Sequence, residues 1–570
     1  MRWLQRVVFV LLATSLMLGQ TNPPNNSAAS DDTKQIADQL KKMQESLNLQ
    51  QKQIADQQLK IDALEKELGK KAAGTAQVVD AALKAPATAP ATMVSDAQDK
   101  PKESPLSFRI GGADFTPGGF VDFETVFRTT NATQGANGST TGNPIATSFG
   151  NLPFNNQVTG HMTEFHMTGQ YSRYNLKVTD KFGANTVTGY LEGDFNGNDA
   201  ANVFVTANGH TNRLRLYWVD LKRNKWEFLG GSSWGWITPN RTGLSPMPAD
   251  LAITYGEDAN VHVGIPYTRA GTFRAVYHPN DNWAMGVSVE NPDQFVNSGE
   301  VIFPFAFNAA LGGQFDAANS TTAPSGFPDF IPKIAYDNTF GNGQHFHFEA
   351  GGLLTSVKIT NVPIGGITFV THKTVGGAGE AAFNVDVVKG FRVLANGLWG
   401  QGAGRYMIGL GPQAVVRPIQ MTPTTFDIEP SMVKGGAGLV GFELQPSNMP
   451  NSQFGAYYGG VYLQRNAFPD TTSPIVLPPT ALVSCQSNQP AQNKPCVGFG
   501  GTNSPNSANR AIQEASFDWT QTLWKNPQHG ALLFITQTSY LTRSPWFVAA
   551  GAPKNAHLMM GFVSLRYVLP

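Results

Sequence analysis

The chain has 570 residues, of which 14% are charged and 41% hydrophobic, and it contains 59 glycines. Its formal net charge is +0 at pH 7, so it lacks the basic surplus that binding to nucleic-acid phosphates requires, and we expect no nucleic-acid partner. It also lacks the run of about twenty apolar residues that a membrane-spanning helix needs, which argues against a helical membrane protein.

The first apolar segment lies at the N-terminus. Residues 7–19 are mostly apolar and follow Arg2 and Arg6. A short apolar stretch behind a basic start is typical of a secretory signal peptide, and this stretch is too short to cross a bilayer comfortably. We therefore predict a signal peptide over residues 1–20 and export of the rest of the chain.

A heptad pattern occupies residues 31–70. Its two core positions hold Leu40, Leu47, Ile54, Ile61 and Leu68, and Ile36, Met43, Gln50, Gln57 and Leu64. This spacing predicts an α-helical coiled coil of about five heptads, and hence self-association. A single helix lying on another surface is the alternative. Residues 71–106 are rich in Ala, Pro and Thr, a composition that predicts a semi-extended linker.

From residue 107 to residue 570 the chain alternates apolar and polar side chains within segments joined by short turns and long Gly-, Asn- and Pro-rich loops. Glu192 and Asp194, for example, share one face of a strand, while Leu191 and Phe195 share the other. This pattern predicts an all-β transmembrane barrel with lipid outside and water inside. In a soluble sandwich the apolar face would be the inner one.

About sixteen antiparallel strands are predicted, an even number as in bacterial outer-membrane barrels. They cover residues 117–128, 162–179, 184–196, 211–223, 225–233, 269–279, 282–291, 330–339, 344–358, 377–388, 390–402, 435–445, 451–466, 512–525, 529–543 and 556–568. The connections between them are alternately short and long, which places the long loops together on one rim.

Cys485 and Cys496 are the two cysteines of the chain, and both lie in the long loop before the fourteenth predicted strand. An exported protein reaches a compartment that permits oxidation, so a disulfide is the simple interpretation. In the entropic model, closing this loop with a disulfide contributes about 2–3 kcal/mol of local stabilisation. A metal-binding pair is the alternative, but it lacks nearby histidine or carboxylate partners.

Three short motifs have enzymatic or metal-binding counterparts. Residues 231–235 fit G-x-S-x-G and residues 436–441 fit G-x-G-x-x-G, but neither is followed by the helix pattern that those motifs require. We interpret both as parts of strands. His345, His347 and Glu349 share one face of a strand at a spacing that can bind metal, although polar residues facing a lumen explain them equally. We therefore predict neither a catalytic site nor a metal site.

Several short strings occur in a characteristic order along the predicted barrel. They are GFVDF at 119–123, LEGDF at 191–195, LRLYW at 214–218, FLGG at 228–231 leading to Trp234, and GAGRY at 402–406. Together with the coiled coil and barrel, these strings make the chain resemble the DcaP-like trimeric porins of Gram-negative outer membranes. The resemblance implies a homotrimer assembled through the coiled coil and the barrel wall, with the coiled coil in the periplasm. It implies neither a cofactor nor an enzymatic activity.

The resemblance also implies passive diffusion of small hydrophilic solutes, with small dicarboxylates suggested by the family. In such porins the third long connection, here residues 234–268, folds into the barrel as a constriction loop. In this chain that loop contains Arg241, Asp250, Glu257 and Asp258.

The alternation of side chains places charges of both signs on the predicted lumen face. The cations are Arg173, Lys177, Arg213, Arg215 and Arg274, and the anions are Asp122, Glu124, Glu192 and Asp194. Opposed charges create a local potential that selects ions, so we interpret the cations as a ladder for anionic solutes. The alternative is that they pair with carboxylates and solvate a polar lumen. A structural barrel that tethers the envelope through its coiled coil, and an outer-membrane enzyme, are the competing functions.

Overall fold

The computed structural model describes part of the chain. The described residues are 104–132, 145–197, 211–247, 261–292, 300–311, 314–315, 326–341, 343–408, 410–486 and 489–570. The predicted signal peptide, the predicted coiled coil and most of the predicted linker lie outside these residues.

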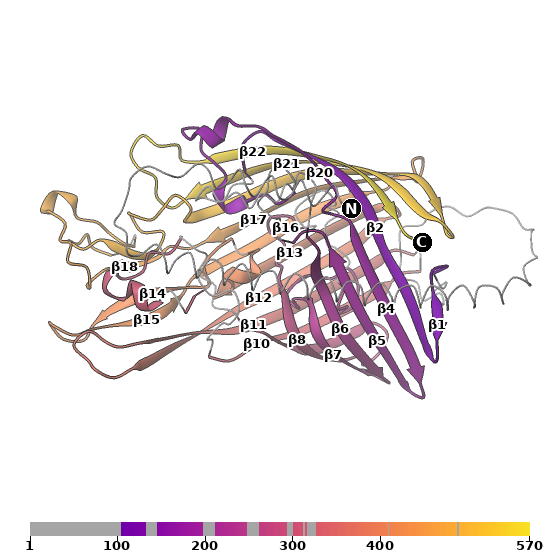
Figure 1. Ribbon diagram of the computed structural model, residues 1–570, viewed down its shortest axis with the longest axis horizontal. Coiled ribbons are helices and arrows are strands. Elements are labelled where there is room, and N and C mark those ends of the chain that lie inside the picture. Colours follow the sequence, from indigo (N-terminus) through magenta and orange to yellow (C-terminus); the bar gives the residue numbers. More distant parts are fainter. Residues whose placement is uncertain are drawn as a thin grey trace, which may run out of the picture. The chain divides into compact units, whose positions relative to one another are not determined.

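One antiparallel sheet closes on itself to form a barrel of sixteen strand positions (Figure 1). The wall strands are β2 (Ala113–Arg128), β3 (Glu164–Thr168), β4 (Arg173–Phe182), β5 (Asn185–Asp194), β6 (Arg213–Arg223), β7 (Trp226–Trp234), β8 (Arg269–Tyr277), β9 (Trp283–Glu290), β10 (Asp329–Thr339), β11 (His345–Asn361), β12 (Val370–Val388), β13 (Phe391–Gln401), β16 (Lys434–Leu444), β17 (Ser452–Leu463), β20 (Asn509–Asn526), β21 (Gly530–Pro545) and β22 (Ala556–Val568). Strand β2 pairs with β22 on one side and with β3 and β4 on the other, so β3 and β4 share one position and the ring is closed.

Every predicted strand overlaps a strand of this wall. Two differences stand out: the predicted strand at 162–179 is interrupted between β3 and β4, and β12 begins at Val370 rather than at residue 377. Five short strands were not predicted: β1 (Phe108–Ile110), which pairs with β2, and the pairs β14 (Ala414–Gln420) with β15 (Phe426–Met432) and β18 (Asn466–Pro469) with β19 (Cys496–Phe499).

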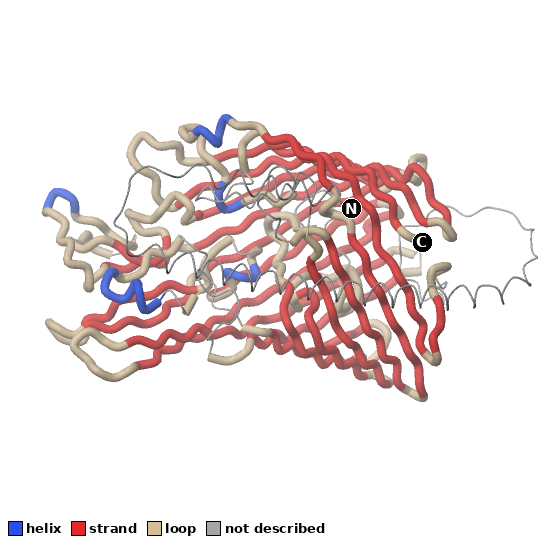
Figure 2. The backbone as a smooth tube through the Cα atoms, viewed as in Figure 1, coloured by secondary structure: helices blue, strands red, loops and turns tan. Residues whose placement is uncertain are grey.

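The few described helices lie in the connections between strands (Figure 2). They are η1 (Phe149–Asn151), η2 (Val158–His161), η4 (Phe305–Phe307), α3 (Asn308–Leu311), η5 (Gly404–Tyr406) and η6 (Pro479–Ala481). No helix in the described part of the chain has the length and apolar character needed to span a bilayer.

The apolar face of the sheet points outward. In β2, Val121 and Phe123 are 63% and 55% exposed, whereas Asp122 and Glu124 are 2% and 0% exposed. Successive side chains of a strand point to opposite faces, so a sheet with exposed phenylalanines and buried carboxylates is polar inside and apolar outside. This confirms the predicted phase, and it is the arrangement that a bilayer favours, because a closed barrel satisfies its backbone hydrogen bonds internally.

The strands differ greatly in length around the ring. β8 and β9 have 9 and 8 residues, close to the 9–11 that cross a bilayer, whereas β11 and β12 have 17 and 19. The longer pair therefore extends beyond the membrane on the long-loop rim, where β14, β15 and β18 also lie (Figure 1).

This extension has its own apolar core. Buried side chains of β11 pack against buried side chains of the β14–β15 hairpin and of α3. The cluster contains Val357, Ile359, Leu311, Val416 and Ile428. In the neighbouring loop, Cys485 and Cys496 are joined by a disulfide and both are buried.

Candidate permeation pathway

The described residues of the connection between β7 and β8 lie inside the barrel. The Arg241 guanidinium forms an ion pair with Glu443 of β16, with Nη1 2.9 Å from Oε2, and the backbone N–H of Val263 donates to Oε2 of Glu514 in β20 over 3.0 Å. β20 lies across the ring from β7 and β8. A segment that leaves β7 and contacts β20 must cross the bore, so this connection narrows the lumen.

The outgoing part of the loop is attached to β10 and β11. Nζ of Lys333 donates to the carbonyl of Trp236 over 2.8 Å, and the backbone N–H of Asn240 donates to Oε1 of Glu349 over 3.1 Å. The backbone N–H of Gly243 donates to Oδ2 of Asp337 over 2.9 Å. Three charged side chains of the wall thus hold backbone groups of the loop, and the loop's own Asn240 side chain adds a hydrogen bond from Nδ2 to Oε2 of Glu349 over 3.2 Å.

The returning part of the loop packs directly on the backbone of the opposite wall. Gly264 has a φ of +107°, and a Cβ at this position would lie 2.2 Å from the carbonyl oxygen of Gly438. Nδ2 of Asn396 donates to the carbonyl of Gly264 over 3.0 Å. Only glycine fits this conformation and this close approach.

Of the predicted constriction residues, Arg241 occupies the bore as described above. Asp250, Glu257 and Asp258 lie outside the described residues.

The predicted lumen charges of β5 and β6 form one ion-paired cluster. Arg213 contacts Asp194 through two hydrogen bonds of 3.0 and 2.7 Å, and Nη1 of Arg215 lies 2.7 Å from Oε1 of Glu192. A register shift between Glu192 and Gly193 accompanies this pairing. Arg173 of β4 joins the cluster, with Nε 3.8 Å from Glu192.

The remaining two predicted cations behave differently. Arg274 is buried and donates to Oγ of Ser233 over 2.6 Å and to the carbonyl of Trp234, and its Cζ lies 5.3 Å from the Trp236 ring. It therefore ties the start of the loop to β8 and does not line the open lumen. Lys177 is exposed on β4.

In each of three ion pairs the cation is the more exposed partner. The side chain of Arg213 is 31% exposed against 6% for Asp194, and that of Arg241 is 13% exposed against 1% for Glu443. Arg173 is 14% exposed against 6% for its carboxylate partner. In these three pairs the guanidinium group is therefore more accessible than the carboxylate, whereas in the Arg215–Glu192 pair the carboxylate is the more exposed partner, at 6% against 1%.

A second buried network was missed as a unit by the sequence analysis. Nζ of Lys333 lies 2.9 Å from Glu349 and 2.8 Å from Glu380, and Nδ1 of His347 lies 2.8 Å from Asp337. The lumen-facing polar positions of neighbouring strands β10, β11 and β12 were the available signal. His347 and Glu349 thus belong to a salt-bridge network, and the described residues contain no group suited to hold a metal ion.

A third network explains the GAGRY string. Nη2 of Arg405 and Oη of Tyr406 each donate to Oδ2 of Asp329 over 2.8 Å. Burial raises the pKa of the Tyr406 hydroxyl well above its ordinary value. The carbonyl of Tyr406 accepts from the N–H of Tyr267 over 2.8 Å. The string therefore holds the end of the constriction loop where it rejoins β8.

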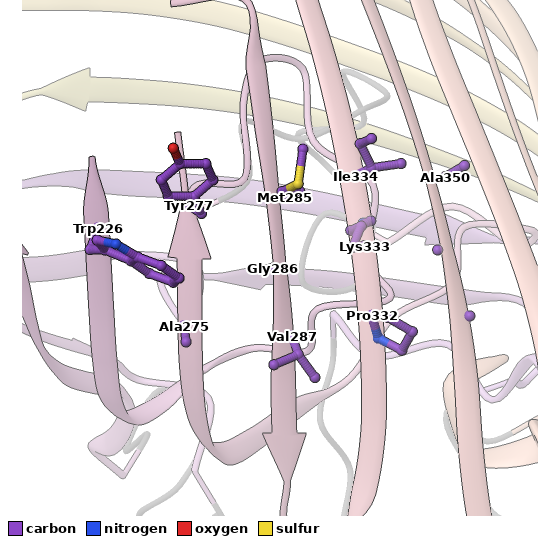
Figure 3. A pocket seen from close by; sticks show the side chains of 12 residues that line it. Trp226, Ala275, Tyr277, Met285, Gly286, Val287, Pro332, Lys333, Ile334 and Ala350 are labelled. Carbon is purple, nitrogen blue, oxygen red and sulfur yellow. The ribbon is translucent and has the colours of Figure 1, made fainter. Parts of the chain in front are cut away.

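The barrel also has an apolar groove of about 730 Å³ on its outer wall (Figure 3). Trp226, Tyr277, Met285 and Val287 line it, together with Pro332 of β10 and small residues of β8, β9 and β11. These side chains are on the lipid-facing side of the wall, so the groove is separate from the permeation pathway.

No protein-family model matches the sequence, and comparison with curated proteins gives no match. Among solved structures, the outer membrane channel DcaP of Acinetobacter baumannii is similar over 81% of this chain and 100% of its own, with 14% identity and a TM-score of 0.51. The chain has the fold of that channel. An anion-selective porin from Comamonas acidovorans covers 80% of this chain and 100% of its own, with 11% identity and a TM-score of 0.40. OmpF of Salmonella typhi, in complex with daunomycin, covers 81% and 100%, with 10% identity and a TM-score of 0.42.

Proposed function

We propose that the protein is a porin of the outer membrane that gives passive diffusion to small hydrophilic solutes and favours anions. The observation that carries this proposal is the set of lumen-side guanidinium groups that are more exposed than their carboxylate partners, at Arg173, Arg213 and Arg241. Rings of fixed charge set ion preference through the local potential rather than through net charge. Small dicarboxylates, which the family resemblance suggests, fit such a wall.

The proposal includes the location and the assembly. A barrel with an apolar exterior and a polar interior fits a bilayer, and the exported chain would carry its predicted coiled coil at residues 31–70 in the periplasm. The heptad pattern supports self-association, for which we propose a homotrimer.

Planar-bilayer recording tests the proposal directly. An open trimeric channel gives conductance that closes in three steps, and a KCl gradient gives a reversal potential displaced toward the chloride equilibrium potential. Intact oligomers that never conduct would favour a structural barrel that tethers the envelope. Liposome swelling against small acids, sugars and amino acids then ranks the solutes.

The enzyme alternative has a specific residue to test. Ser233, within the G-x-S-x-G spacing, is buried and donates to the carbonyl of Trp234, while its Oγ accepts from Arg274. Both hydrogen bonds use the Ser233 hydroxyl to hold the start of the constriction loop. Lipid hydrolysis by the purified protein that is lost on Ser233→Ala would contradict the porin proposal.

A further inference from the structure

Two arginines flank one tryptophan on the long-loop rim of the barrel. Cζ of Arg465 lies 5.0 Å from the centroid of the Trp546 ring, and Cζ of Arg510 lies 5.9 Å from it. The indole is held in place because its Nε1 donates to the carbonyl of Leu463 over 3.0 Å. Both guanidinium groups are thus held near a fixed aromatic surface, at the ends of β17 and β20.

This site lies above aromatic side chains of the outer wall. The ring of Tyr462 lies 6.4 Å from Trp546 in an edge contact, and the ring of Trp399 lies 6.3 Å from Tyr462 in a stacked contact. Tyr462 and Trp399 are 40% and 53% exposed, whereas the neighbouring Leu463 is fully buried. Aromatic rings on the outside of a membrane protein mark the level where acyl chains meet head groups. The arginines therefore lie at head-group level.

A third cation lies beside them. Lys434 is exposed at the start of β16, and its carbonyl accepts from the N–H of Gln464 over 2.8 Å, next to Arg465 in the chain. Within the described ranges, Lys434, Arg465 and Arg510 have no carboxylate partner, and Nε of Arg465 is buried without an acceptor. The lumen arginines, by contrast, have carboxylate partners.

We propose that Lys434, Arg465 and Arg510 bind the phosphate groups of an anionic glycolipid in the outer leaflet, whose acyl chains lie against Tyr462 and Trp399. Guanidinium groups bind phosphate through paired hydrogen bonds, and basic clusters at the membrane surface recognise anionic head groups. The inference rests on the proposed outer-membrane location, with the long loops facing outward.

Native mass spectrometry of the full-length protein titrated with bisphosphorylated lipid A tests this site. Because each cation at a membrane surface contributes a separate increment of lipid affinity, Arg465→Gln with Arg510→Gln should weaken lipid A binding about thirtyfold. The matched control is Arg223→Gln with Lys525→Gln, which removes two exposed cations from the short-turn rim. The control variant should bind lipid A as the unmodified protein does, and monophosphoryl lipid A should bind the unmodified protein more weakly.

Three outcomes would overturn the proposal. The first is equal lipid A binding by both variants. The second is full displacement of lipid A by inorganic pyrophosphate, which would assign the site to free phosphate. The third is a changed oligomeric state of the arginine variant with unchanged lipid binding, which would assign the rim to a second copy. A difference in gel migration between heated and unheated samples shows that each variant is folded. Single-channel conductance is measured on the same samples, so a failure of the porin proposal is seen separately.

Discussion

Replacing Arg213 by glutamine tests whether an exposed cation in front of its partner sets ion preference. The Arg213 side chain is 31% exposed and Asp194 is 6% exposed. An ion passing about 5 Å from the guanidinium in water interacts with it by about 0.8 kcal/mol, which screening at 0.1 M salt reduces to about 0.5 kcal/mol. The sign is opposite for anions and cations, so the substitution changes their difference by about 1 kcal/mol. The anion-to-cation permeability ratio should then fall about fivefold.

The assay is the reversal potential of single channels in a KCl gradient. Arg223→Gln is the control, because it removes an equally positive side chain that is exposed on the short-turn rim at the end of β6. Conductance should change little in either variant, since the wall and the loop keep their positions. A reversal potential that moves no further in Arg213→Gln than in Arg223→Gln would refute the reasoning and leave the lumen arginines as structural ion pairs.

Three further substitutions test how the constriction loop and the wall are held. Arg241→Gln leaves Glu443 buried without its cation, so the loop should detach and single-channel current should become larger and noisier, while the double variant with Glu443→Gln should recover in stability. Gly264→Ala should lower the melting temperature and widen the pore, because the added Cβ would collide with the backbone of the opposite wall. Gly189→Ala is the control: its Cβ would have no atom within 4 Å, so neither property should change. Lys333→Met should destabilise the barrel by about 3–5 kcal/mol in denaturant titrations, because two carboxylates lose their buried partner; unchanged midpoints would contradict this.

The wall could be predicted from sequence because its physical rule is local. A side-chain period of two, with lipid on one side, assigns Asp122 inward and Phe123 outward without knowledge of neighbours. The pair of Arg213 with Asp194 also follows from a hairpin, since both residues lie at the long-loop end of adjacent strands. The register shift beside Glu192 could not be predicted, because the alternation carries no signal for one extra residue in a strand.

The sequence predicted which connection forms the constriction but not the contacts that hold it. Arg241 and Glu443 are 202 residues apart, and their contact depends on the path of a loop through the bore, which no local pattern encodes. Arg274 shows the same limit. The alternation of side chains predicted which face of the strand it occupies, but its burial depends on Trp236, which belongs to the constriction loop. The strands β14, β15, β18 and β19 were missed because they lie within connections and pair with each other rather than with the wall.

Closure of the ring has a consequence for how the molecule is made. The seam joins Phe120 of β2 to Val568 of β22. Strand β2 therefore has a pairing partner on both sides only when β22 is in place. Until β22 pairs with β2, both margins of the open sheet offer unpaired backbone groups to other chains. Contacts of such large sequence separation form slowly, and long-lived open intermediates aggregate. Truncation before β22 should therefore leave an unsealed, aggregation-prone sheet.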